Sequence, residues 1–307
     1  MNDRLTLRVG GRDIDVSRPG KVLFPDAGIT KADLAEYYAA VAETMAPHLR
    51  DRPLAFERYP DGIGKSGFFQ KDVPGYYPDW IARTEVEKEG GSLTQVVVRD
   101  ELATLVYLAG QACITPHPWP ARTDALRRPD RIILDLDPSG DDPALVRAAA
   151  RDVRHIFEAI GLVPFLMTTG SRGFHVVCPL QPEQDSDDVR QLAQDVAELA
   201  SRRRPDGYTT EWRKVRRRGR VFLDYLRNGY AQTSVAPYAV RSRAGASVAT
   251  PIAWDELAGI APDAYTVRSI PRRLAQKDDP WRGIDGYRTS PTTARRALDE
   301  LLDERRA

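Results

Sequence analysis

An apolar run that ends in two acids constrains the fold of this chain more than any other stretch. Residues 131–138 read Arg-Ile-Ile-Leu-Asp-Leu-Asp-Pro. Because side chains alternate between the faces of a strand, Asp135 and Asp137 project from the same side. Pro138 cannot donate to a sheet ladder and predicts the end of the strand. Neighbouring carboxylates repel each other unless a cation or a shared proton joins them. Two interpretations follow: exposed acids at a sheet edge, or a divalent metal site that needs a third ligand.

Composition excludes several classes of protein. The 307 residues are enough for one large or two modest domains, and 42% hydrophobic with 29% charged residues is typical of a globular protein. No apolar run approaches the length that crosses a membrane, and the first residues lack the layout of a secretion signal. The two cysteines, Cys113 and Cys178, provide neither a disulfide framework nor a zinc-finger spacing. We therefore expect a cytoplasmic protein with no membrane partner.

Positive charge is distributed unevenly, although the formal net charge is only +1. Residues 202–204 are consecutive arginines, and residues 213–220 contain six further lysines and arginines. A run of this kind is usually a solvated loop, unless a site for a polyanion lies nearby.

The order of the expected elements favours an α/β fold. We expect helices from Asp142, Asp185 and Ser290, and strands over 163–167, 174–179, 220–226 and 235–240. This order predicts an α/β sandwich with a mixed or antiparallel sheet. It lacks the regular βαβ alternation of a Rossmann fold, and the turn at 170–173 lacks the GxGxxG and Walker spacings.

Two lysines flank an expected helix start in the first half. Thr30 and Asp33 form a capping-box pattern, with Lys21 before the turn and Lys31 in the first helical turn. A lysine near a helix start opposes the macrodipole, which suggests a role other than helix stability. Ordinary exposed lysines remain the alternative.

Aromatic residues and a histidine precede the acidic strand. Residues 59–77 resemble a loop that carries Phe68 and Phe69 beside Lys71. Such an aromatic pair is either part of the core or a stacking platform for nucleic-acid bases. Residues 115–119 predict a rigid loop in which two prolines fix the direction of His117. Structural and functional roles are both open for this histidine.

The Asp-x-Asp pair occurs in several kinds of site. An EF-hand is excluded because Val146 stands where that loop needs its final glutamate. Phosphatases of the haloacid-dehalogenase type also place such a pair after an apolar strand, but Gly-Thr normally follows it rather than Pro138-Ser139. These phosphatases and metal-dependent glycosyltransferases stay open as alternatives.

Nucleotidyl transfer uses all of the unusual features together. Two divalent ions bridged by carboxylates activate a 3′-hydroxyl and neutralise the leaving pyrophosphate. Asp224, on an expected neighbouring strand, offers the third acid. The turn with Ser171 and Arg172, followed by His175, offers hydrogen-bond donors for a triphosphate. The basic and aromatic residues offer a path for a template.

Three short motifs resemble those of the archaeo-eukaryotic primase superfamily: Asp135-Leu-Asp137, Ser171-Arg-Gly-Phe-His175 and Phe222-Leu-Asp224. In particular, the chain resembles the polymerase domain of bacterial ligase D, which serves non-homologous end joining. The resemblance extends over nearly the whole chain, with longer matching stretches at 21–25, 67–71, 78–80, 130–138 and 236–241.

The resemblance implies one primase-polymerase domain over residues 1–307. Within it we expect an N-terminal α/β subregion of about residues 1–120, a catalytic subregion of about 121–290, and a C-terminal helix over 291–305. The implied fold is α/β, with an archaeo-eukaryotic primase-like catalytic core. This core has two packed mixed or antiparallel sheets, RRM-like, flanked by helices.

The resemblance also implies roles for individual residues. The ligands of two Mn²⁺ or Mg²⁺ ions are Asp135, Asp137 and Asp224. The residues that contact the incoming NTP or dNTP are Ser171, Arg172 and His175, with His117 and Arg241 close to the nucleotide and metals. The residues that contact DNA are Lys21 and Lys31 at a 5′-phosphate, Phe68 and Phe69 at the templating base, and Lys71.

The implied activity is template-directed addition of nucleotides to a primer 3′-hydroxyl at breaks and gaps in DNA. The family prefers ribonucleotides and manganese, adds untemplated nucleotides, and cooperates with Ku and a DNA ligase at the bacterial nucleoid. Many relatives carry lysine where Arg172 stands, which keeps the charge but changes the geometry. No ligase or phosphoesterase motif is present in these residues. Two alternatives remain: a DNA-end-bridging module with vestigial catalysis, or a de novo primase.

Overall fold

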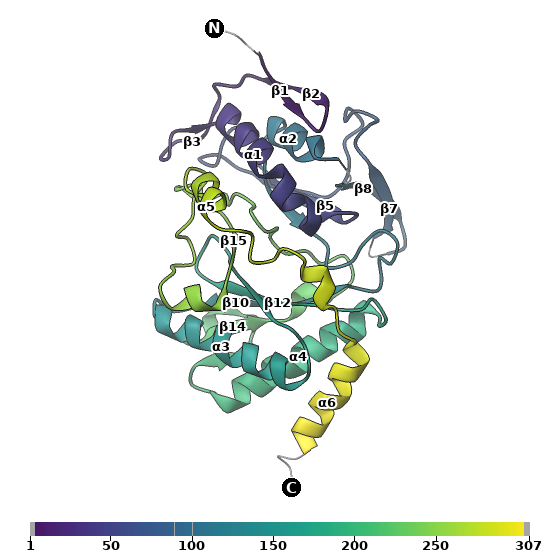
Figure 1. The fold of residues 1–307 in the computed structure, drawn as a ribbon, viewed down its shortest axis with the longest axis vertical. Coiled ribbons are helices and arrows are strands. Elements are labelled where there is room, and N and C mark those ends of the chain that lie inside the picture. Colours follow the sequence, from purple (N-terminus) through teal and green to yellow (C-terminus); the bar gives the residue numbers. More distant parts are fainter. Residues whose placement is uncertain (1–3, 89, 100, 304–307) are drawn as a thin grey trace. The chain divides into compact units, whose positions relative to one another are not determined.

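The computed structural model describes residues 4–88, 90–99 and 101–303 (Figure 1). The chain forms two compact units whose segments alternate along the sequence. Unit 1 comprises residues 1–119, 233–250 and 263–279. Unit 2 comprises residues 120–232, 251–262 and 280–307.

Unit 1 is built on a five-stranded sheet of order β6-β5-β8-β7, in which β9 also pairs with β5. Its strands are β5 (Pro53–Arg58), β6 (Phe68–Gln70), β7 (Arg83–Glu87), β8 (Leu93–Val98) and β9 (Cys113–Pro118). Two small sheets join β1 (Arg4–Val9) to β2 (Arg12–Ser17) and β3 (Val22–Phe24) to β4 (Ile29–Thr30). The helices are α1 (Lys31–Leu49), α2 (Ala103–Gly110) and α5 (Ile270–Gln276).

Helix α1 begins at the capping box that the sequence predicted. The Thr30 hydroxyl accepts a bond from the Asp33 backbone N–H, and the Asp33 carboxylate accepts one from the Thr30 backbone N–H. Its expected inner face is buried and comprises Leu34, Tyr38, Val41 and Met45. Helix α1 packs against α2.

Unit 2 is built on a six-stranded sheet of order β13-β14-β10-β12-β11-β15. Its strands are β10 (Arg131–Pro138), β11 (Phe165–Thr168), β12 (Phe174–Pro179), β13 (Tyr208–Thr209), β14 (Val221–Asp224) and β15 (Thr250–Ile252). Its helices are α3 (Pro143–Ala159), α4 (Ser186–Arg203) and α6 (Pro291–Asp303), with single 3₁₀ turns η1 (Lys214–Arg216), η2 (Leu226–Asn228), η3 (Trp254–Ala258) and η4 (Ile284–Tyr287).

The central strands of this sheet are antiparallel, whereas β13 pairs with β14 in parallel, so the sheet is mixed as predicted. Helices α3 and α4 pack against each other and against β10. The aspartates at the expected helix starts, Asp142 and Asp185, both act as N-caps. The expected C-terminal helix is α6, and residues 304 and 305 of that prediction lie outside the described residues.

Three expectations for unit 1 were wrong. Residues 115–119 are not a loop, because strand β9 includes most of them. The backbone polar groups of the β9 prolines point away from β5. On that outer side, the carbonyls of Pro116 and Pro118 accept hydrogen bonds from the N–H groups of Ala236 and Ser234. A missing N–H on that side does not interrupt pairing with β5.

The expected strand over 235–240 is absent for a related reason. Pro116 and Pro118 have no backbone N–H to donate to residues 234–236, so a regular strand ladder against β9 cannot form. Tyr238 also has a φ of 63°, in the left-handed region, which ends any extended run there. The expected loop over residues 59–77 also differs in part, because Phe68 and Phe69 form the start of strand β6.

In the described part of the chain, we find no helix with the length and apolar character that a membrane span requires.

Candidate active site

Strand β10 presents two acids on one face of the unit 2 sheet. Asp135 is paired directly with Asp224 on β14 and directly with His175 on β12. Asp137 lies two residues further along β10 and therefore on the same face. The Nε2 atom of His175 is 3.4 Å from Oδ1 of Asp135. Three neighbouring strands thus bring together four of the residues that the sequence singled out.

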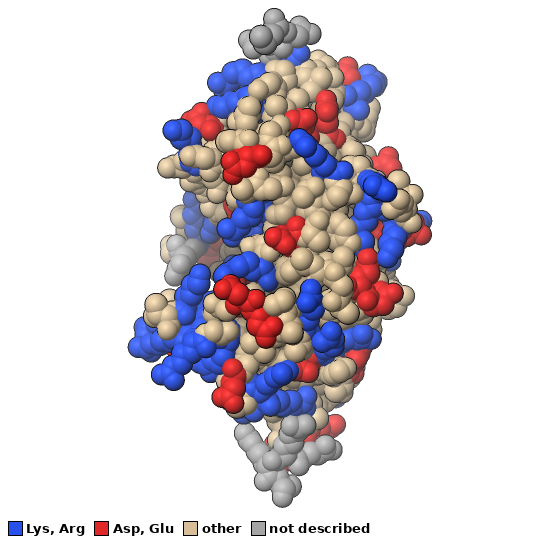
Figure 2. Space-filling model, turned by 90° about the vertical axis from the view of Figure 1, so that its left-hand side faces the viewer, with Lys and Arg blue, Asp and Glu red and all other residues tan. Residues whose placement is uncertain are grey.

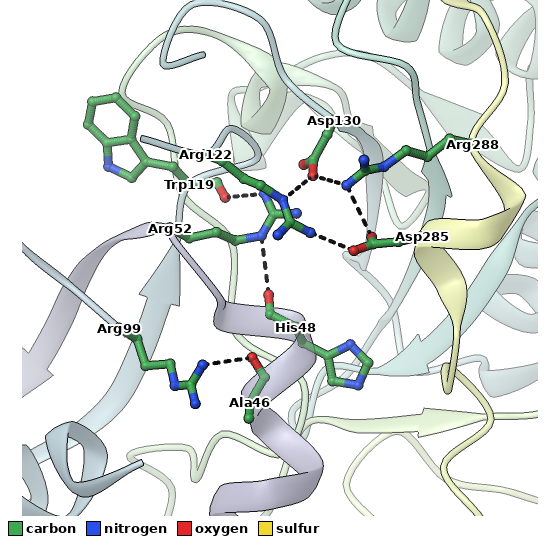
Figure 3. Close-up of polar contacts among 9 residues, drawn as sticks. All are labelled: Ala46, His48, Arg52, Arg99, Trp119, Arg122, Asp130, Asp285 and Arg288. Atoms are coloured by element: carbon green, nitrogen blue, oxygen red, sulfur yellow. Dashed lines mark hydrogen bonds and ion pairs between the residues drawn. The ribbon is translucent and has the colours of Figure 1, made fainter. Parts of the chain in front are cut away.

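Buried polar contacts fix the position of this strand. Asp130, directly before β10, is only 3% exposed and accepts hydrogen bonds from Arg122 and Arg288 (Figure 3). Both arginines also pair with Asp285. Next to the acids, the side-chain amide of Asn228 bonds both the N–H and the C=O of Ile133, each at 2.8 Å. The amide continues the ladder of β10 beyond the last residue of β14.

Arginine side chains lie against the acids. Arg217 Nη1 donates to Asp137 Oδ2 at 2.8 Å, and Arg172 Nη2 is 3.8 Å from the other oxygen of Asp137. Arg227 Nε is 3.2 Å from Asp224 Oδ2 and 3.6 Å from Asp135 Oδ2. Neither Arg217 nor Arg227 was predicted from the sequence as a site residue. Arg227 follows Asp224 by three residues, and this spacing could have indicated an ion pair between the two side chains.

Arg217 is the buried residue of the basic run at 213–220. Its side chain bonds the carbonyls of Glu211 and Trp212 and stacks 4.0 Å above the ring of Phe222. Its neighbours Lys214, Arg216 and Arg218 are exposed. The run is therefore a solvated loop held in place by one guanidinium that reaches the acids.

The electrostatics at Asp224 favour a further positive charge beside this carboxylate. Burial raises the pKa of Asp224, and the nearby Asp135 raises it further, while Arg227 only partly opposes the shift. Carboxylate oxygens on one face are the ligands that Mg²⁺ and Mn²⁺ prefer. Within residues 4–88, 90–99 and 101–303, no three His, Cys, Asp or Glu side chains already converge as a metal site. The chemistry of the donor set nonetheless fits divalent ions once the carboxylates turn toward them.

The turn between β11 and β12 carries Ser171 and Arg172. The Thr169 hydroxyl closes this turn, because it donates to the Gly173 carbonyl at 3.0 Å and accepts from the Gly173 N–H at 3.2 Å. A Cβ at Gly173 would lie 1.9 Å from the Leu136 carbonyl, so the turn must have glycine there. Its close approach to β10 places Arg172 beside Asp137.

A second group of predicted residues lies in unit 1. His117 on β9 and Phe69 on β6 are in edge-to-face contact, with ring centroids 5.3 Å apart. His117 Nε2 is 3.3 Å from Glu57 Oε1 on β5, and Arg241 acts electrostatically on the same carboxylate. Glu57 was missed by the sequence analysis, since a glutamate near the end of a strand gives no local signal.

The aromatic pair is exposed rather than buried. Phe68 is 51% exposed and Phe69 44% exposed, which excludes the interpretation of both as core residues. The Arg58 guanidinium lies 5.8 Å from the centre of the Phe68 ring, and Lys71 is exposed directly after β6.

Lys21 and Lys31 lie side by side in unit 1. The Lys31 backbone N–H donates to the Lys21 carbonyl at 2.8 Å. Lys31 is a buried residue whose ammonium donates to the Ser17 carbonyl at 2.8 Å, whereas the Lys21 ammonium pairs with Asp61 at 2.6 Å. Burial, followed by the charges of Arg18 and Lys21, lowers the pKa of Lys31 to about 8. A bound anion would relieve this concentration of positive charge.

Comparisons with known proteins agree with the motifs. A family model described as "LigD, primase-polymerase domain" matches residues 30–281. The "Multifunctional non-homologous end joining protein LigD" of Pseudomonas aeruginosa is 33% identical over 296 residues, which cover 94% of this chain and 35% of that protein. The "Bifunctional non-homologous end joining protein LigD" of Bacillus subtilis is 31% identical over 271 residues, covering 87% and 43%. The chain therefore spans less than half the length of these relatives.

A solved structure matches in fold. The "Polymerase Domain from Mycobacterium tuberculosis Ligase D in complex with DNA" has a TM-score of 0.83 and 31% sequence identity, and the match covers 89% of this chain and 98% of that one. This likeness confirms the predicted fold class.

Proposed function

The chain belongs to the LigD primase-polymerase domain family, as its motifs predicted, and we propose that it extends a DNA primer strand at breaks and gaps. Membership of this family identifies it as an enzyme, a nucleotidyltransferase of the polymerase type. We further propose that residues 1–307 work as one primase-polymerase domain, in repair by end joining.

One observation supports this proposal above all others: Asp135 is paired directly with both Asp224 and His175. We assign Asp135, Asp137 and Asp224 as ligands of divalent ions, a pair of Mn²⁺ or Mg²⁺. Such ions, when bound, activate the 3′-hydroxyl and neutralise charge on the pyrophosphate. The acids would supply the oxygen ligands, in competition with the arginines that pair with them.

The neighbouring donors suit the triphosphate of an incoming nucleotide. We assign Ser171, Arg172 and His175 to its phosphates, because they lie on one glycine-closed turn and the strand after it. A guanidinium offers paired donors to phosphate oxygens. In unit 1 we assign His117 and Arg241 to the nucleotide as well.

The basic and aromatic residues suit DNA. We assign Lys21 and Lys31 to a 5′-phosphate, Phe68 and Phe69 to stacking at the templating base, and Lys71 to the backbone. An exposed aromatic pair beside cations is the usual platform for single-stranded bases. On the face drawn in Figure 2, lysine and arginine side chains also gather at the lower left, and positive charge of this kind supports sequence-independent contact with phosphates. The solved M. tuberculosis domain was itself in complex with DNA.

The finer features of the activity are proposed by analogy with the family. We propose gap filling with a preference for ribonucleotides and manganese, terminal addition, and cooperation with Ku and a DNA ligase at the nucleoid. The relatives named for non-homologous end joining are longer than this chain. Their remaining activities are therefore not assigned to it.

Extension of a gapped, 5′-phosphorylated duplex tests the proposal. The protein should fill the gap, with more product from ribonucleotides than from deoxynucleotides and more with manganese than with magnesium. A matched duplex with a 5′-hydroxyl serves as the control and should yield less product. Binding without any extension would instead indicate an end-bridging module, and product on a single-stranded template without a primer would indicate a de novo primase.

A further inference from the structure

Glu57 is a largely buried carboxylate in unit 1 to which the proposed function assigns no role. It lies on β5, between β6 and β9. Its direct cross-strand partners are Phe69 on one side and Thr115 on the other. His117 lies two residues beyond Thr115, on the same face of the sheet. The sheet register therefore places Phe69, Glu57 and His117 on one face of the sheet, with His117 diagonal to Glu57 across β5 and β9.

Both carboxylate oxygens of Glu57 accept hydrogen bonds. Oε1 is 3.3 Å from His117 Nε2, and Oε2 accepts from the Ser242 hydroxyl at 2.5 Å. The side chains of Glu57 and His117 are only 24% and 12% exposed. These bonds, formed away from bulk water, restrict both the carboxylate and the imidazole to one orientation.

The carboxylate remains ionised over the working pH range. Burial alone raises the pKa of Glu57, but the hydrogen bonds from His117 and Ser242 outweigh it and lower the pKa to about 2. An ionised carboxylate only accepts hydrogen bonds. His117 must therefore carry a proton on Nε2, which selects the Nε2–H tautomer whenever the ring is neutral.

We propose that Glu57 is a positioning residue that sets the orientation and tautomer of His117 and, through the His117–Phe69 contact, the direction of Phe69. This inference rests on the proposed function, in which His117 serves the incoming nucleotide and Phe69 the templating base. A carboxylate behind a functional histidine is a common way of fixing its ring. The competing explanation is that Glu57 only stabilises the sheet.

The variant Glu57→Gln separates these explanations. Glutamine keeps the volume of the side chain but replaces one acceptor oxygen with an NH₂ group, so it cannot accept from His117 and Ser242 at once. We expect kcat/KM for the incoming nucleotide to fall roughly 10- to 100-fold, as for other residues that orient a functional histidine. The preference for a 5′-phosphorylated over a 5′-hydroxyl gap, which we assign to Lys21 and Lys31, should not change.

The matched control is Glu85→Gln, an exposed glutamate of β7 in the same sheet. It should leave kcat/KM, the melting temperature and DNA affinity as in the wild type. Ser242→Ala, which removes one of the two bonds to Glu57, should lower kcat/KM in the same direction and by a smaller factor.

A spectroscopic readout tests Glu57 independently of activity. In the wild type without nucleotide, the ¹⁵N shifts of the His117 ring should report the Nε2–H tautomer. In Glu57→Gln they should report a mixture. If the ring shifts and kcat/KM both match the wild type, or if only the melting temperature falls, the positioning role is wrong. If the wild type extends no primer but the ring shifts change as expected, the proposed function fails and the control of His117 by Glu57 stands.

Discussion

The guanidinium of Arg217 donates a hydrogen bond to the carboxylate of Asp137, with Nη1 2.8 Å from Oδ2. Asp137 is one of the acids that we assign to divalent ions. The arginine therefore neutralises part of the charge that the ions require. It also bonds two backbone carbonyls of its own loop, so the loop at 213–220 and the acids are coupled.

Removal of this guanidinium should have opposite effects on metal binding and on stability. In Arg217→Ala, manganese should bind more tightly, because Asp137 loses a competing cation. The free energy of unfolding should fall by about 1.5–3 kcal/mol, the usual contribution of hydrogen bonds to a charged group. Calorimetric titration with manganese and urea unfolding measure the two effects. The neighbouring variant Arg218→Ala, at an exposed position, should change neither. Weaker manganese binding in Arg217→Ala would contradict the assignment of Asp137.

Asp224 should make the melting temperature of the protein depend on divalent ions. Its pKa is raised in the folded protein, mainly by burial. The folded state therefore binds the proton more tightly than the unfolded state, and stability is lost as the pH rises through the ordinary carboxyl range. At neutral pH the ionised Asp224 destabilises the metal-free protein, so Asp224→Asn should raise its melting temperature.

With manganese, the wild type should melt at a higher temperature than Asp224→Asn. A ligand at 100 times its Kd stabilises the folded state by about 2.7 kcal/mol, so the wild type should gain stability that Asp224→Asn does not. A chelator should abolish the gain. Thermal melts with manganese and with EDTA make the measurement, with the exposed Asp206→Asn as the matched control. An equal manganese response in Asp224→Asn and wild type would argue against Asp224 as a ligand.

Lys31 should reduce stability at neutral pH. Its pKa is lowered to about 8, mainly by burial, so the unfolded state binds more protons between pH 8 and the ordinary lysine value of 10.5. Stability of the wild type should therefore rise with pH through this window. Lys31→Gln should be more stable at pH 7 and lose this part of the pH dependence, as thermal melts across the pH range would show.

The same variant should bind DNA less well. Loss of a charge-assisted hydrogen bond to a phosphate should weaken binding of a 5′-phosphorylated gap roughly 10- to 100-fold. Binding of a 5′-hydroxyl gap should change little. Fluorescence anisotropy with both duplexes tests this, with Lys88→Gln, a lysine paired with Asp72 elsewhere in unit 1, as the control. Equal losses on both duplexes would show that Lys31 does not recognise the phosphate.

Gly173 should tolerate no side chain. A Cβ there would meet the Leu136 carbonyl at 1.9 Å, and strand β10 would have to move. Overpacking of this kind costs about 1–3 kcal/mol or more, so Gly173→Ala should lower the free energy of unfolding by at least that range. Nucleotide affinity should fall with it, because the turn carries Ser171 and Arg172. Gly259→Ala, in unit 2 with open space around it, should unfold as the wild type does. Wild-type stability in Gly173→Ala would contradict the close approach.

Much of the site was predictable because its signals are local. The period of a strand places Asp135 and Asp137 on one face, and Pro138 marks the strand end. Capping residues predict the starts of α1, α3 and α4 correctly. The glycines of the turn at 170–173 indicate a tight connection even before the contact with Leu136 is known.

Other features of the site and the fold depend on contacts between residues that are far apart in the sequence. Arg217 is one of several arginines in a run, and only its tertiary contacts distinguish it from its exposed neighbours. Glu57 becomes notable only when three strands align in register. The prolines of β9 suggested a loop because the sequence does not show which side of the strand faces β5. A proline is compatible with the strand when its missing N–H lies on the other side.

The variant Asp135→Asn tests whether the acids of β10 are required for nucleotidyl transfer. The measurement is extension of a gapped, 5′-phosphorylated duplex with manganese and ribonucleotides, together with anisotropy on the same duplex. We predict that the wild type fills the gap, whereas Asp135→Asn binds the duplex as tightly and forms no product. Extension by Asp135→Asn at the wild-type rate would show that Asp135 has no role in nucleotidyl transfer.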